Sequence, residues 1–179
     1  MIETIAVARV LREAVASPYP NLVTRPTGAA VRARIEDALA AVGASGALLD
    51  FSDVELLDLS CADEIVAKLM RGAPRTVALR GLHEDLWEAV DEVLRRQGLA
   101  VVIVPDVDPP ALLGAVTADQ RIAFDHLSRS GETRGPAAGR ALGWTCERAS
   151  QALDALQTLG VACRAGSGAF RLPLPLTTQ

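Results

Sequence analysis

The segment DLSCADEIVAKL, residues 58–69, places a serine and three carboxylates where an apolar run gives way to an apolar helix. Ser60 has the chemistry of a phosphoacceptor, and Asp58, Asp63 and Glu64 could form an acidic surface for a partner. Ser60 could equally cap the helix, because Asp63 follows it at capping-box spacing and the serine oxygen would accept from a backbone N–H. Such a cap contributes about 1 kcal/mol and requires no further function.

Electrostatics argue against a phosphate on Ser60. A helix N-terminus favours an anion, but a phosphate carries a charge of about −1.5 to −2 and would be repelled by Asp58, Asp63 and Glu64. No arginine lies within several residues of the serine in the sequence. We therefore keep Ser60 as a candidate phosphoacceptor and expect the three acids to form an exposed partner surface or a solvated helix start.

Motifs for catalysis or for metal binding are absent from the sequence. The chain lacks a GxxxxGK phosphate loop, and its two histidines, His83 and His126, have no ligand at metal-binding spacing. The three cysteines are odd in number and far apart, which favours neither a disulfide framework nor a zinc site. We expect no catalytic residue, no metal, no cofactor and no enzymatic activity.

Composition indicates a folded protein without a membrane span. The chain has 179 residues, of which 50% are hydrophobic, enough to build a substantial core. No apolar run approaches the roughly 20 residues that a spanning helix needs. The N-terminal residues lack the basic start and cleavage site of a signal peptide. We expect a cytoplasmic location and no membrane partner.

Charge and proline content divide the chain in two. Residues 1–114 carry 11 basic and 17 acidic side chains, whereas residues 115–179 carry 7 basic and 5 acidic ones. Between them, PDVDPPALLG at residues 105–114 contains three prolines and two aspartates and lacks helix or strand periodicity. We predict a first domain at residues 1–105, a linker at 106–115 and a second domain at 116–179.

Hydrophobic periodicity in the first domain predicts helices that alternate with short strands. Short apolar runs at residues 46–51, from residue 76 onward and at 100–104 predict strands, while residues 5–11 suit either an edge strand or a helix start. This alternation predicts an α/β fold with parallel strand pairs and right-handed crossovers. The buried helix positions that we expect are Val31, Ile35, Ala38 and Leu39; Ala62, Ile65, Val66 and Leu69; and Leu86, Val90, Val93 and Leu94.

The string DFSDVELLDLSCADEIVAKL, residues 50–69, resembles the central strand, loop and helix of STAS domains, the family of the anti-sigma factor antagonists. With LVTRPTGAAVRARIEDAL upstream, it is similar to STAS-like domains found alone, beside histidine-kinase-type ATPases or fused to DNA-binding modules. The resemblance covers about residues 3–105. It implies an α/β domain with a mixed sheet and helices that binds a protein partner in signalling, with Asp58 as the loop acid and Ser60 at the phosphorylated position. The chain departs from the family pattern at Asp53, Leu59, Cys61 and Asp63.

The second domain is predicted to contain three helices followed by a hairpin. Thr117 and Gln120 have capping-box spacing at the start of the first helix, the segment GPAAGRALG forms the second, and Thr145 caps a third that closes at Gly160. The segment VACRAGSGAFRLP, residues 161–173, predicts two strands joined by a glycine turn. The expected inward positions are Ala123, Phe124 and Leu127 in the first helix, and Ala149, Leu153 and Leu156 in the third.

This order of elements is that of an α+β winged helix domain. The run ALGWTCERASQALDALQTLGV, residues 141–161, strongly resembles the two central helices of winged helix transcription regulators, and the resemblance covers residues 116–173. In such modules the second helix of the pair enters the major groove, and the wing contacts phosphate or the minor groove. The resemblance implies groove-facing side chains at Thr145, Glu147, Arg148, Ser150 and Gln151, wing residues Arg164 and Arg171, and backbone contacts by Arg134 and Arg140.

These observations favour a regulator that couples a STAS-like domain to a winged helix domain bound to double-stranded DNA. The net charge of +2 on residues 115–179 is small for a DNA-binding surface, and a homodimer would double it. Gln151 has the chemistry to recognise adenine. The alternative is a partner-switching adaptor that does not bind DNA and in which both domains dock proteins.

Overall fold

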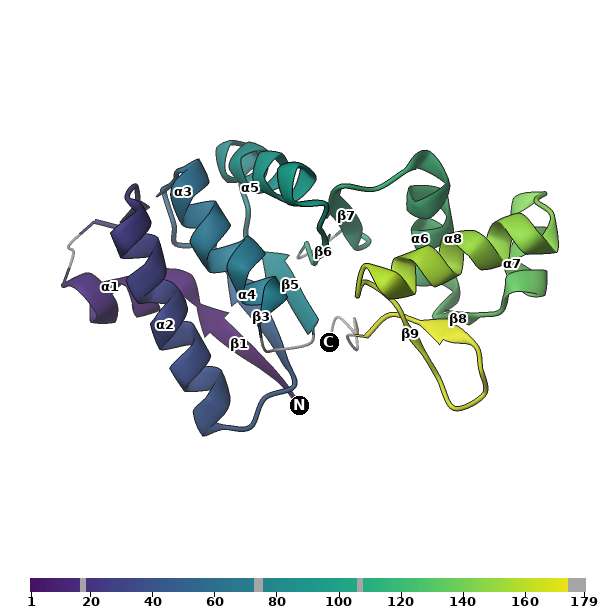
Figure 1. The fold of residues 1–179 in the computed structure, drawn as a ribbon, viewed down its shortest axis with the longest axis horizontal. Helices are drawn as coiled ribbons and strands as arrows, with labels where there is room; N and C mark the ends of the chain where they lie inside the picture. Colours follow the sequence, from purple (N-terminus) through teal and green to yellow (C-terminus); the bar gives the residue numbers. More distant parts are fainter. Residues whose placement is uncertain (17–18, 73–75, 106–107, 174–179) are drawn as a thin grey trace. The chain divides into compact units, whose positions relative to one another are not determined.

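The chain adopts a mixed α/β fold. The computed structural model describes residues 1–16, 19–72, 76–105 and 108–173, and Figure 1 traces the chain through them. The residues divide into two compact units: unit 1 comprises residues 1–99 and 113–115, and unit 2 comprises residues 100–112 and 116–179.

The strands β1, β3 and β5 of unit 1 are hydrogen-bonded neighbours in that order. The strands β1, β3 and β5 run parallel in a continuous register, in which Ala6 pairs with Asp50 and Asp50 with Arg80. The expected parallel pairs are therefore present. These strands are β1 (Ile2–Ala6), β3 (Gly46–Asp50) and β5 (Thr76–Arg80); β6 (Ala100–Ile103) belongs to unit 2, and β7 (Ala111–Gly114) has residues in both units.

The N-terminal segment is both a strand and a helix. The strand β1 lies at the edge of the sheet and passes directly into α1 (Val7–Val15). Of residues 5–11, the first two therefore end the edge strand and the others begin the helix. The remaining elements of unit 1 include a two-stranded parallel sheet that periodicity did not predict. They are β2 (Asn21–Leu22), α2 (Arg25–Ala41), β4 (Leu56–Leu57), α3 (Leu59–Ala62), the π-helical turn η1 (Asp63–Lys68), α4 (Leu69–Arg71) and α5 (Glu84–Gln97).

The predicted apolar faces of unit 1 are buried, with one exception. All four positions are buried in the segment α3-η1-α4 and all four in α5, as are Val31, Ile35 and Leu39 of α2. Ala38 is exposed, so its prediction was wrong. The small side chain of alanine is tolerated on the buried and on the exposed face of a helix, so Ala38 is a weak indicator of which face is buried.

Part of the predicted linker is a strand. Ala111–Gly114 forms β7, and the backbone N–H of Gly114 donates to Asp91 Oδ1 at 2.9 Å. The prolines at positions 109 and 110 obscured the strand because they cannot donate to a sheet, but they precede it rather than interrupt it. Residues 106–107 of the predicted linker, and residues 174–179 of the predicted second domain, lie outside the described part of the chain.

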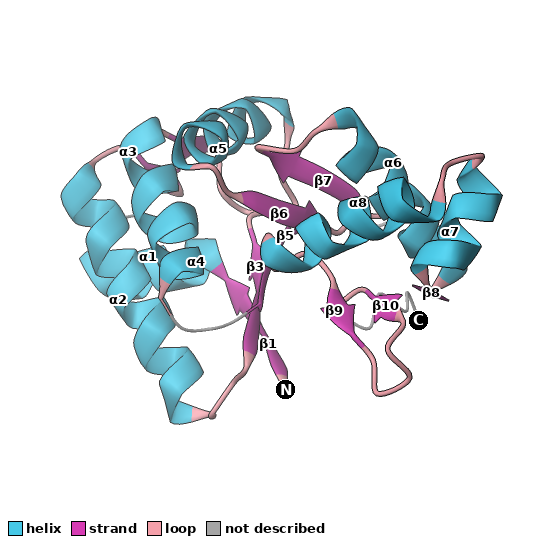
Figure 2. Ribbon diagram, turned by 45° about the vertical axis from the view of Figure 1, so that its right-hand side comes forward, coloured by secondary structure: helices cyan, strands magenta, loops and turns pink. Residues whose placement is uncertain are grey.

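In residues 116–173, unit 2 contains three helices and a small antiparallel sheet of order β8-β10-β9. The predicted capping box is present, because Thr117 and Gln120 exchange side-chain to backbone hydrogen bonds at the start of α6. The predicted hairpin forms around Gly166 and Gly168 and appears as the loop between β9 and β10 in Figure 2. The elements are α6 (Ala118–Ser130), β8 (Glu132–Thr133), α7 (Gly135–Leu142), α8 (Cys146–Thr158), β9 (Cys163–Arg164) and β10 (Phe170–Arg171).

The core of unit 2 includes the predicted inward faces of α6 and α8 and Ala152, together with other buried residues such as Ala138 and Phe170. Two glycines of α7 permit close packing on α8. A Cβ at Gly139 would lie 3.1 Å from the carbonyl oxygen of Trp144, and one at Gly135 would meet Ser150. The α7–α8 interface therefore depends on the absence of side chains at these positions.

Across the part of the chain that the structure describes, no helix is both long enough and apolar enough to span a bilayer.

Candidate functional site

The helix that begins after β4 is capped by Asp58 and not by Ser60. The Oδ1 atom of Asp58 accepts from the backbone N–H of Cys61 at 2.7 Å and from Ser60 Oγ at 2.8 Å. Burial alone would raise the pKa of Asp58, but these hydrogen bonds outweigh it and lower the pKa. The predicted Ser60 cap was wrong, because aspartate is an equally good cap residue two positions earlier. Ser60 lies inside the first turn and is half-buried.

Glu64 is buried within a cluster of cations. Its side chain is 4% exposed, and its Oε1 atom accepts from Lys68 Nζ at 2.5 Å and from Arg25 Nη1 at 2.8 Å. Arg32 Nε lies 3.5 Å from the other oxygen. Burial would raise the pKa of Glu64, but the bonds from Lys68 and Arg25 dominate and lower it. A buried carboxylate is thus stabilised by partners from α2 and from its own turn.

The three acids do not form the exposed rim expected from the sequence. Asp63 is half-buried, accepting from Arg25 Nη1 at 2.8 Å and from Gln97 Nε2 at 3.2 Å. Arg25 bridges Asp63 and Glu64 from 38 and 39 positions away in the sequence. The repulsion expected at Ser60 is therefore reduced by Arg25, which the local sequence does not contain.

The backbone around Glu64 is a π-helical turn, which is uncommon and is found disproportionately at functional sites. Four of its six residues are buried, including Ile65 and Val66. Cys61 precedes this turn, and burial raises the pKa of its thiol to about 11. The thiol donates to the carbonyl oxygen of Thr24 at 3.0 Å, so Cys61 is an unreactive packing residue.

An open depression of about 310 Å³ lies between the start of α3 and the end of α5. Leu59, which is 43% exposed, lines it together with polar side chains of both signs. The other lining residues are Arg25, Ser60, Asp63, Val93, Arg96 and Gln97. Ser60 therefore shares a surface with two arginines, although neither is near it in sequence.

Leu59 also borders a second open depression, of about 550 Å³, along α5. Apart from Ala89, its other lining residues are acidic, and two of them, Asp85 and Glu88, are exposed in the first turns of α5. Leu59 is therefore an apolar side chain between an acidic depression and a depression with polar side chains of both signs. We refer to Leu59 and the residues lining the 310 Å³ depression as the Leu59 surface.

In unit 2, α8 presents a polar outward face. Thr145 caps the helix by accepting from the backbone N–H of Arg148 at 3.2 Å, as predicted. Thr145, Glu147, Arg148 and Gln151 are exposed. Gln151 Nε2 donates to Glu147 Oε1 at 3.4 Å. Four of the five side chains assigned to this face are therefore open to solvent.

Ser150 does not belong to that face. It is half-buried and lies against Gly135 of α7, where an added Cβ would be 3.2 Å from the Ser150 Cβ. The prediction that Ser150 faces outward was wrong. Its polar side chain suggested exposure, but a small hydroxyl also fits a tight helix crossing beside a glycine.

Arg148 is held by two neighbours. Its Nε and Nη2 atoms donate to the two carboxylate oxygens of Asp119 at 2.8 and 2.7 Å, and its guanidinium lies 4.4 Å from the centroid of the Trp144 ring. The hydrogen bonds from Arg148 lower the pKa of Asp119. Arg148 nevertheless remains 52% exposed.

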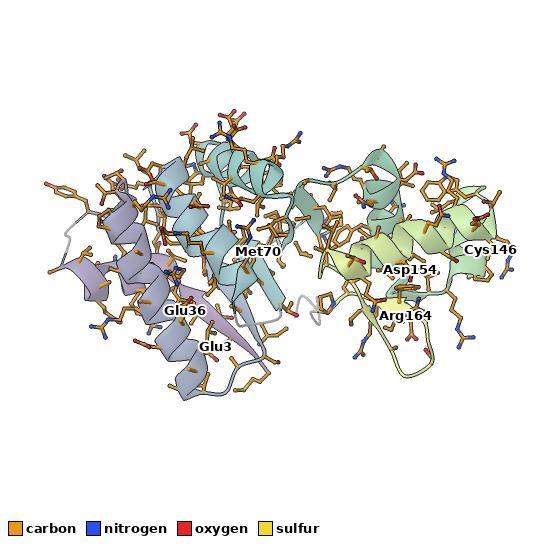
Figure 3. All side chains as sticks on the ribbon, in the orientation of Figure 1. Glu3, Glu36, Met70, Cys146, Asp154 and Arg164 are labelled. Carbon is orange, nitrogen blue, oxygen red and sulfur yellow. The ribbon has the colours of Figure 1, made fainter. Side chains whose placement is uncertain are left out.

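The four other arginines predicted to contact DNA differ in their surroundings. Arg164 Nη2 donates to Asp154 Oδ1 at 2.6 Å, and its guanidinium stacks 4.2 Å from the Phe170 ring. Figure 3 shows Arg164 and Asp154 turned toward each other from β9 and α8. Arg134 donates to the carbonyl oxygen of Ser167 at 2.8 Å. The side chains of Arg140 and Arg171 are exposed and make no hydrogen bond or ion pair with a described residue.

Sequence analysis missed Asp119 and Trp144 at α8, and Arg25 and Arg32 at Glu64. Asp119 lies in the first turn of α6, where the helix dipole favours an acid. Its presence could be explained by the helix alone, so nothing in the sequence indicated a partner in α8. Arg25 and Arg32 lie on one face of α2, seven positions apart. This spacing was the available signal that they share a partner.

Comparison of the chain with protein family models, with curated proteins and with solved structures finds no match.

Proposed function

We propose that this protein is a cytoplasmic regulator in which unit 2 binds double-stranded DNA through α8 and unit 1 docks a protein partner through the Leu59 surface. The observation that carries the proposal is the outward face of α8, whose N-terminal half exposes Thr145, Glu147, Arg148 and Gln151. The protein acts by binding, without a catalytic step.

The order of elements in unit 2 supports DNA binding. Helix, strand, two helices and an antiparallel hairpin follow one another as in a winged helix domain, which the sequence of residues 116–173 resembles. In that arrangement α8 is the helix that enters the major groove, with its N-terminal side chains toward the base edges. Unit 1 correspondingly serves as the STAS-like domain.

Free arginines supply the phosphate contacts. The side chains of Arg140 and Arg171 are exposed and bond to no described residue, so their guanidinium groups pair with DNA phosphates without breaking an internal bond. Arg134 has one bond, to a carbonyl oxygen. Few phosphates are neutralised by one copy, and affinity depends on their number, so we propose a homodimer that doubles the contacts.

A salt series tests this proposal. Affinity of the protein for mixed-sequence duplex DNA is followed by fluorescence anisotropy as salt rises. The Arg140→Glu, Arg171→Glu double variant reduces the slope of log K against log salt by roughly 2, one for each lost phosphate contact. Arg9→Glu, an exposed arginine on α1, is the matched control and leaves the slope unchanged. Absence of binding even at low salt refutes DNA binding.

The Leu59 surface supports the role of unit 1. An exposed leucine beside charged groups of both signs suits a protein interface, in which an apolar anchor is surrounded by a polar rim. A phosphate on Ser60 would share this surface with Arg25 and Arg96, which offer charge-assisted hydrogen bonds. We therefore propose Ser60 as a regulatory phosphoacceptor, whose hydroxyl donates to Asp58 in the unmodified protein, while Asp63 and Glu64 are neutralised by Arg25.

Partner capture tests the docking surface. A protein that copurifies with the wild type should be lost from Leu59→Glu and retained by Val42→Glu, because Val42 is 46% exposed and lies away from this surface at the end of α2. Mass spectrometry of the native protein should find a phosphorylated Ser60 peptide under some growth condition. Equal capture by both variants would contradict the docking site, and an unmodified peptide throughout would contradict the phosphoacceptor.

A specific observation favours a second candidate function, an adaptor that binds only proteins. Arg148 and Arg164 are each paired with a carboxylate, Asp119 and Asp154, so the α8 face has little free positive charge. The salt series separates the two functions, because an adaptor has no affinity for duplex DNA at any salt concentration.

A further inference from the structure

We infer that Arg148 is a pre-oriented guanine-reading side chain, and that Asp119 and Trp144 are the residues that position it. The inference rests on the proposed DNA binding by α8. It adds the base that this helix recognises and the two residues, outside the predicted DNA contacts, on which the recognition depends.

The hydrogen bonds of Arg148 occupy only one edge of its guanidinium. Asp119 accepts from Nε and Nη2, whereas no described residue accepts from Nη1. An arginine has five N–H donors in a fixed planar fork. The side-on pair with Asp119 therefore leaves the end-on edge, formed by Nη1 and the second hydrogen of Nη2, without an acceptor among the described residues, on a side chain that is 52% exposed.

Trp144 fixes the plane of the same group. Its ring lies 4.4 Å from the guanidinium carbon, so one face of the fork is covered while the carboxylate restrains its edge. A long, flexible side chain loses rotamer freedom when it binds. Because Arg148 is already held in the free protein, less of that loss is incurred when it meets a ligand.

The chemistry favours a base edge over a phosphate. The paired guanidinium and carboxylate are close to neutral together, and a phosphate at the free edge would approach the Asp119 carboxylate and the nearby Glu147. Guanine instead offers two neutral acceptors, O6 and N7, in the major groove with the spacing of an arginine fork. Arg148 is the third residue of α8, in the N-terminal part that a reading helix directs at bases.

Selection of duplexes from a randomised pool by the full-length protein tests the inference, followed by binding to the selected site and its single-base variants. The selected site should contain a guanine whose replacement weakens wild-type binding by about 5- to 150-fold, the range of a bidentate arginine–guanine contact. Arg148→Lys keeps the charge but loses the fork, so it should lose this preference and keep its affinity for mixed-sequence DNA.

Asp119→Asn replaces one of the two acceptor oxygens that orient Arg148 with an NH2 donor, so the two-bond pair cannot form, and it also removes a negative charge next to Arg148. We expect a reduced guanine preference without a loss of affinity for mixed-sequence duplex. The same change in the Arg148→Lys background should have no effect on base preference, which a general loss of stability would not reproduce. Glu92→Gln, which removes the carboxylate paired with Arg96 in unit 1, is the matched control and should leave the preference intact.

The outcomes separate this inference from the proposed function. Duplex binding without a guanine preference, or a preference that Asp119→Asn leaves unchanged, overturns the inference and leaves DNA binding standing. If Asp119→Asn increases affinity for all sequences alike without reducing base preference, the ion pair is an inhibitory contact and the inference is wrong. Absence of any duplex binding overturns both.

Discussion

Arg25 Nη1 lies 2.8 Å from Glu64 Oε1, although 39 positions separate the two residues in the chain. This pair joins the start of α2 to the π-helical turn η1 and compensates a carboxylate that is almost completely buried. The contact changes the chemistry expected at Ser60, because acids that have only Lys68 as a basic neighbour in the sequence are also paired with arginines from α2 in the fold.

Glu64→Gln should destabilise the protein by about 1–3 kcal/mol at neutral pH, since it removes charge-assisted hydrogen bonds from a buried site. The folded-state pKa of Glu64 lies below its ordinary value of 4.5. Its contribution is therefore complete above about pH 4.5 and is lost as the pH falls through the folded-state pKa. Urea denaturation at several pH values should show that the difference between wild type and variant shrinks in acid.

The matched control for this prediction is Glu88→Gln, because the side chain of Glu88 is exposed and bonds to no described residue. Its free energy of unfolding should stay within about 0.5 kcal/mol of the wild type. A Glu64→Gln difference that is constant with pH would contradict the lowered pKa.

Asp58→Ala should cost about 0.5–2 kcal/mol because it removes the N-cap of α3. Ser60→Ala should cost less than that, because its hydroxyl donates to Asp58 and leaves the bond between Asp58 and Cys61 intact. Chemical denaturation of both variants under identical conditions measures the difference. A larger loss for Ser60→Ala than for Asp58→Ala would show that the serine, and not the aspartate, holds the start of this helix.

Gly135→Ala should destabilise unit 2 by about 1–3 kcal/mol, because the new methyl group would overlap the Ser150 side chain. Ser150→Gly in the same chain should recover part of the loss by removing the opposing atoms. Gly166→Ala is the control, since a Cβ at Gly166 meets nothing within 4 Å and its φ is not in the left-handed region. Thermal unfolding measures all three, and equal effects of the two alanine substitutions would contradict the close packing of α7 on α8.

The elements with strong periodicity or local capping chemistry were predictable from the sequence. The buried face of α5 and the caps at Thr117 and Thr145 depend on residues within one or two turns, so the sequence contains all the information they need. The pairing of β2 with β4 involves two residues from each strand, too few for any period to be detected.

The environment of the candidate sites was less predictable, for a different reason. The Leu59 surface and the surroundings of Arg148 each depend on side chains brought from other elements, such as Arg25 and Asp119. A motif specifies residue types at one segment, but the charge balance at that segment is set by tertiary contacts. The sequence therefore indicated Ser60 and Arg148 as candidate residues. It did not predict that Arg25 pairs with the acids near Ser60, or that Asp119 pairs with Arg148.

The most direct measurement of the central claim is a titration of the isotope-labelled protein with duplex DNA, followed by the chemical shifts of its backbone amides. We predict that the largest changes fall in the first two turns of α8, around Arg148 and Gln151, with further changes at Arg140 and Arg171. Changes confined to unit 1, or no changes at low salt, would contradict the claim that α8 contacts DNA.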